Sequence, residues 1–110
     1  MNAKMNESLI YKLRNFCKER GIVYCAIFGS RARGGNKKGS DLDLLINTKV
    51  HGLKFVGLTL DLEEFLGVKV DVITRDGLKH PRGMAGEYFK KEVERSLKVI
   101  YLENSEGKHP

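Results

Sequence analysis

The sequence has no tryptophan, only two cysteines and two prolines, and no apolar run near the ~18 residues that a membrane-spanning helix needs. Cys17 and Cys25 show neither a disulfide framework nor a metal-ligand spacing, so we expect two free thiols in a reducing compartment. Residues 1–6 lack the apolar core of a signal peptide. These absences predict a cytoplasmic protein with no membrane segment.

Aromatic residues are also scarce, at 8% of the chain, and the sequence shows no evident platform for stacking bases. Lysine and arginine outnumber aspartate and glutamate by 20 to 14, which gives a formal charge of +6. This surplus suits a polyanionic partner such as a nucleotide, a nucleic acid or an acidic protein. A dispersed basic surface explains it better than a dedicated nucleic-acid patch, so direct nucleic-acid binding is left open.

The length of 110 residues indicates one domain over 1–110, with a core over about 8–102 and a polar tail over 103–110. Apolar spacing predicts helices over 7–20, 52–66 and 86–97, a short helix near 30–34, and strands over 22–28, 41–47, 69–74 and 98–102. In the last long helix we expect Phe89, Val93 and Leu97 to face inward. The segment 75–85 is expected to be irregular or a short turn of helix. This order predicts an α+β (mixed α/β) fold, a small sheet of about four strands flanked by helices.

A Gly-Ser pair closes the first predicted strand. Gly29 lets the backbone approach a phosphate closely, and Ser30 can cap a helix and donate its hydroxyl to a phosphate oxygen. Arg31 and Arg33 follow, near enough to contact a triphosphate or an acceptor. A capping serine after a strand is common, and the sequence lacks the Lys-Ser/Thr of a phosphate loop, so the pair alone does not define a site.

Two aspartates begin the second predicted strand. Residues i and i+2 of a strand share a face, so Asp41 and Asp43 project together while Leu42 and Leu44 face the core. Adjacent carboxylates repel each other, and a divalent cation such as Mg²⁺ relieves that repulsion. The alternative is a turn residue followed by a charge at the edge of a sheet.

A third carboxylate, Asp71, is the only acid between Val68 and Ile73. An ionised carboxylate in a buried strand is unfavourable unless it is paired or binds a metal. If its strand lies beside the strand over 41–47, three carboxylates converge, as a two-metal site requires, and Asp71 is also a candidate general base. The structural alternative is a salt bridge with Lys69, which shares its strand face, or with another basic residue.

Together these motifs resemble the minimal nucleotidyltransferases of the DNA polymerase β superfamily. The resemblance rests on Gly29-Ser30, a gap of ten residues, Asp41-x-Asp43 and a later Asp71, within the strings GSRARG, SDLDLLI and LEEFLGVKVDVIT. It covers about residues 8–102. It implies a polymerase β-like fold, Asp41, Asp43 and Asp71 as Mg²⁺ ligands and catalytic carboxylates, and phosphate contacts at Gly29 and Ser30.

The resemblance further implies a function and a partner. Minimal members of this group are antitoxins that pair with a separate helical HEPN-type toxin, and the implied chemistry is transfer of AMP from ATP to a partner tyrosine. Two alternatives stay open: an antitoxin that acts by binding alone, and a nucleotidyltransferase that acts on a small molecule. We expect no second substrate-binding domain, which counts against the latter unless a dimer provides the cleft.

Overall fold

The computed structural model describes residues 7–32, 42–80 and 82–103. Their elements are, in chain order, α1 (Glu7–Arg20), β1 (Ile22–Phe28), α2 (Gly29–Ala32), β2 (Leu42–Thr48), α3 (Leu53–Leu66), β3 (Val70–Thr74), α4 (Arg75–Lys79), α5 (Gly83–Ser96) and β4 (Lys98–Leu102). The four predicted strands and three long helices are all confirmed. The helix α5 begins three residues earlier than expected, and the segment 75–85 contains the short helix α4, in agreement with the expected short turn of helix.

The four strands form one mixed sheet in the order β3-β2-β1-β4. Strand β1 pairs antiparallel with β2 and β4, whereas β2 and β3 are parallel. Parallel neighbours need a crossover, and α3 supplies it between β2 and β3. The predicted α+β architecture with a mixed sheet is therefore confirmed, and β3 and β4 are its edge strands.

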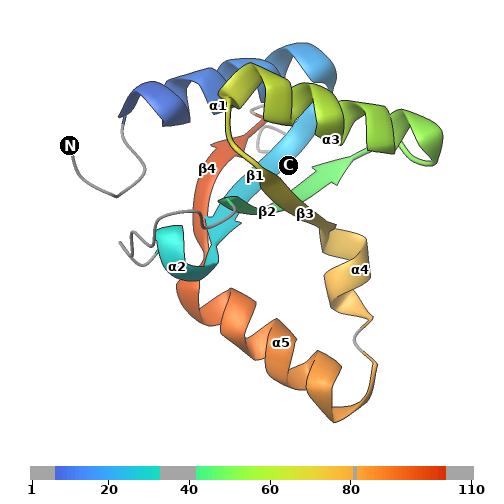
Figure 1. Ribbon diagram of the computed structural model, residues 1–110. Coiled ribbons are helices and arrows are strands. Elements are labelled where there is room, and N and C mark those ends of the chain that lie inside the picture. The colour runs from blue at the N-terminus through green and yellow to red at the C-terminus, as the bar shows by residue number, and fades with distance from the viewer. Residues whose placement is uncertain (1–6, 33–41, 81, 104–110) are drawn as a thin grey trace, which may run out of the picture.

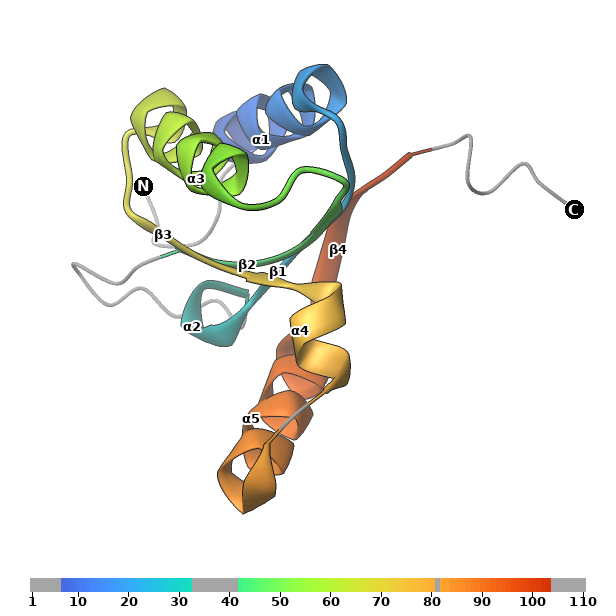
Figure 2. The ribbon, with the colours of Figure 1, turned by 90° about the vertical axis from the view of Figure 1, so that its right-hand side faces the viewer.

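Helices cover both faces of the sheet. Helices α1 and α3 lie on one face, and α2, α4 and α5 lie on the other (Figures 1 and 2). Each face has its own apolar cluster, and β2 contributes to both because its side chains alternate. Leu42 and Leu44 are fully buried in the cluster beneath α1 and α3, whereas Leu45 belongs to the cluster with Phe28 and Val93 on the α5 side.

Cys17 and Cys25 are free and buried in the larger cluster, which confirms the expectation of two unpaired thiols. A hydrogen bond with Cys17 and burial raise the pKa of the Cys25 thiol. A thiol with a raised pKa is a poor nucleophile, so Cys25 has a packing role. No helix within the described ranges is long and apolar enough to span a bilayer.

Candidate active site

Asp43 and Asp71 are direct partners in the register of the parallel strands β2 and β3. Side chains two residues apart share a face, so Asp43 lies on the face of Leu45 and Asp71 on that of Ile73. Leu45 and Ile73 both pack in the cluster on the α5 side. The two carboxylates therefore project from adjacent strands on the face covered by α2, α4 and α5, as the expectation of neighbouring strands required.

The environment of Asp71 differs from the sequence-based expectation. Its side chain is exposed, because β3 is an edge strand and the α5 side of this edge is not covered at Asp71. None of the ion pairs between described residues involves Asp71, so the structure gives no support to a salt bridge with Lys69. The expectation of a buried Asp71 was wrong, and Asp71 is a candidate site residue because of its position opposite Asp43.

Gly29 lies directly beside the carboxylate of Asp43. It has a φ of +77°, a conformation that residues with a side chain rarely adopt. A Cβ atom at this position would lie 2.5 Å from Oδ2 of Asp43. Glycine is therefore required twice, once for the backbone conformation and once to leave room for the carboxylate.

The backbone of Gly29 is anchored by Ser96, the last residue of α5. The Gly29 N–H donates to Oγ of Ser96 over 3.0 Å, and this hydroxyl donates to the carbonyl of Glu92 over 3.2 Å. Ser96 is 9% exposed and is the only buried polar residue in the described part of the chain. The Gly29 N–H is thus used within the protein, and phosphate binding would depend on the N–H groups that follow it.

Sequence reasoning missed Ser96. One indication was available, because Ser96 follows Val93 by three residues and so falls on the buried face of an amphipathic helix. Its partner is 67 residues away, which no local pattern reveals.

The remaining predicted site residues are placed only in part. Ser30 and Arg31 belong to α2, directly after Gly29. Arg33 and Asp41 lie outside the described residues. The structure therefore brings together Gly29, Asp43 and Asp71 from three adjacent elements.

The described carboxylates suit a magnesium ion in their chemistry. Asp43 and Asp71 offer only oxygen donors from neighbouring strands, and Mg²⁺ is usually held by one or two carboxylates together with substrate phosphates. No group of three or more histidine, cysteine or acidic side chains that could hold a metal ion occurs in residues 7–32, 42–80 and 82–103. The third expected ligand, Asp41, is not among them.

A mixed four-stranded sheet with paired carboxylates beside a Gly-Ser turn defines a polymerase β-like nucleotidyltransferase domain. The nucleotidyltransferase domain family model matches residues 10–104. The chain belongs to this family and is a nucleotidyltransferase.

Individual relatives agree. A candidate protein adenylyltransferase of Methanocaldococcus jannaschii is 35% identical over 99 residues, which cover 87% of this chain and 93% of the relative. A solved structure of a candidate minimal nucleotidyltransferase is 29% identical, with a TM-score of 0.64 over 89% of this chain and 95% of its own. A complex of a tri-AMPylated Shewanella oneidensis HEPN toxin with an MNT antitoxin matches at 13% identity and a TM-score of 0.62, covering 93% of this chain and 76% of that one, and shows the shared fold.

Proposed function

We propose that this nucleotidyltransferase transfers AMP from ATP to a tyrosine hydroxyl of a HEPN-type toxin and thereby acts as its antitoxin. The main support for a transferase site is the register that places Asp43 opposite Asp71, with Gly29 directly beside Asp43. Two repelling carboxylates give a fold no stability, so their juxtaposition indicates a cation-dependent function. The names of the relatives support adenylyl transfer to a protein.

The proposed reaction is a substitution at the α-phosphorus of ATP. The acceptor oxygen forms a bond to this phosphorus, and the bond to the β-phosphate oxygen breaks with release of pyrophosphate. Asp71 is the proposed base that takes the proton of the acceptor hydroxyl, and its exposed carboxylate is open to an acceptor that approaches from solvent. The turn after Gly29, with Ser30, Arg31 and Arg33, holds the triphosphate.

Asp41, Asp43 and Asp71 are the residues that would hold magnesium in this proposal. The bound ion would offset the negative charge of the phosphates and favour ionisation of the attacking hydroxyl. The oxygen donors of Asp43 and Asp71 on adjacent strands support this part of the proposal. Gly29 keeps the carboxylate of Asp43 close to the phosphate turn, since any side chain there would collide with it.

The test is an adenylylation assay with a helical partner encoded beside this chain. We expect incubation with ATP and magnesium to add the mass of one or more AMP groups to a partner tyrosine, as measured by peptide mass spectrometry. Asp43→Asn is the matched control and should give no modified peptide. Extension of an RNA 3′ end by this chain alone, with no modified protein, would contradict the proposed acceptor.

A toxin-neutralisation assay separates catalysis from binding. If Asp43→Asn still forms the complex but no longer relieves toxicity, the antitoxin acts by transfer. Full neutralisation by this variant would show an antitoxin that acts by binding alone.

A further inference from the structure

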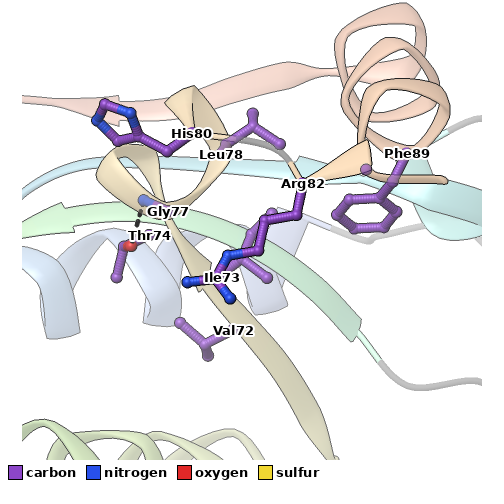
Figure 3. A pocket seen from close by; sticks show the side chains of 9 residues that line it. Val72, Ile73, Thr74, Gly77, Leu78, His80, Arg82 and Phe89 are labelled. Atoms are coloured by element: carbon purple, nitrogen blue, oxygen red, sulfur yellow. Dashed lines mark hydrogen bonds between the residues drawn. The ribbon is translucent and has the colours of Figure 1, made fainter. Parts of the chain in front are cut away.

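A pocket of about 480 Å³ opens between β3, α4 and the first turns of α5. Figure 3 shows it from close by, and the lining side chains come from all three elements. The lining residues are Val72, Ile73, Thr74, Gly77, Leu78, His80, Arg82, Gly86 and Phe89. Its volume falls within the roughly 300–1,000 Å³ that is typical of small-molecule sites.

The pocket is next to the carboxylates. Ile73 follows Asp71 by two residues on β3 and shares its face, which separates them by about 7 Å at ~3.3 Å per residue. On the opposite side, the ring of Phe89 packs edge-on against Phe28, with centroids 6.2 Å apart. Phe28 pairs with Asp43 and immediately precedes Gly29. The contact between Phe28 and Phe89 thus connects the pocket to the turn that begins at Gly29.

The lining has the chemistry of a base-binding site. Phe89 is 45% exposed, although the sequence predicted it to face inward. A partly exposed ring offers a surface on which a planar base can stack. Arg82 is exposed, has no ion-pair partner among the described residues, and brings a guanidinium that stacks on planar rings. Arg82 and His80 are the charged or ionisable members of the lining, and no acid is present.

We infer that this pocket binds the nucleobase of the nucleotide substrate, with the ring stacked against Phe89. The inference rests on the proposed nucleotidyl transfer, which places the triphosphate at the Gly29 turn. A base is joined to that triphosphate through its sugar. In this proposal the base lies beyond Asp43 and Asp71, in the pocket beside Phe89. The absence of acids in the lining avoids repulsion of a ligand that carries phosphates.

The test compares two magnesium-bound probes by calorimetry, ATP and inorganic tripolyphosphate. The second probe has the phosphates but no base. We expect Phe89→Ala to weaken ATP binding by about tenfold, because base–aromatic stacking is lost, and to leave tripolyphosphate binding unchanged. Phe89→Leu keeps apolar volume against Phe28 but removes the aromatic face, so it should weaken ATP binding in the same selective way.

Tyr88→Ala is the matched control, since Tyr88 is the neighbouring aromatic residue on α5, is 67% exposed and does not line the pocket. It should leave both affinities unchanged. Equal weakening of both probes by Phe89→Leu would mean general damage to the fold and would overturn the inference.

Two other outcomes would also overturn it, and they separate it from the proposed function. If the Phe89 variants bind ATP normally but transfer AMP poorly to the partner, the pocket binds the acceptor. If the unmodified chain binds tripolyphosphate as tightly as ATP, the base contributes nothing while the phosphate site stands. Failure to bind either probe would instead contradict the proposed function itself.

Discussion

Gly29 and Asp43 are so close that a methyl group on Gly29 would lie 2.5 Å from Oδ2 of the carboxylate. Gly29 is the first residue after β1, and Asp43 lies on the neighbouring strand β2. The last residue of β1, Phe28, is the direct partner of Asp43 in the strand register. This contact links the turn proposed to hold the phosphates with a carboxylate proposed to hold the metal. Because of this contact, even an alanine in place of Gly29 should disturb the site.

We predict that Gly29→Ala abolishes transfer, because the new methyl group collides with the Asp43 carboxylate. It should also lower the free energy of unfolding by about 1–3 kcal/mol, because alanine is strained at a positive φ. Gly21→Ala is a matched control, because Gly21 also has a φ of +77° but a Cβ there would meet nothing within 4 Å. It should destabilise the chain by a similar amount and retain activity. Urea unfolding and the adenylylation assay measure the two effects; equal activity of the two variants would show that the Asp43 contact is unimportant.

Asp71→Asn should reduce the transfer rate by about 10²–10⁴-fold, because the variant cannot accept the acceptor proton. The melting temperature should stay the same or rise slightly, since one of two repelling charges is removed. Asp61→Asn is the control: Asp61 is exposed on α3 and pairs with Arg20 at 3.0 Å, away from the site. Marked unfolding of Asp71→Asn with normal activity of the folded fraction would assign Asp71 a structural role.

Ser96→Ala should weaken the binding of magnesium-bound ATP and destabilise the chain by about 1–3 kcal/mol, because the Gly29 N–H loses its buried acceptor. Thr59→Ala removes a comparable helix hydroxyl, which donates to the Phe55 carbonyl over 3.0 Å on α3. It should leave ATP binding unchanged. If both variants bind ATP equally well in calorimetry, Ser96 does not position the phosphate turn.

Magnesium and ATP should bind as a coupled pair. Without a cation, the carboxylates of Asp43 and Asp71 repel a triphosphate, and even at an effective dielectric constant near 20 this repulsion weakens binding by about tenfold or more. Calorimetric titration of ATP with magnesium and then with a chelator measures the difference. Asp43→Asn should reduce this difference, and equal affinity under both conditions in the unmodified chain would argue against a metal site here.

The sequence by itself determined the elements and the identity of the candidate site residues. Helix-spaced apolar residues in α1 and continuous apolar runs in β1 and β2 are local patterns, so their bounds were predictable to within a few residues. The alternation of side chains along β2 predicted that Leu42 and Leu44 face the core, and both are buried. The adjacency of β2 and β3 was a hypothesis that the Asp43–Asp71 register confirms.

The tertiary structure decided what depends on the order of the strands and the docking of helices. Placement of β3 at the edge left Asp71 exposed, although its apolar neighbours had suggested a buried strand. Docking of α5 brought Ser96 to Gly29 and left Phe89 partly exposed at the pocket. Local periodicity encodes which face of an element is apolar, but how completely a neighbouring element covers that face is fixed only when distant segments pack together.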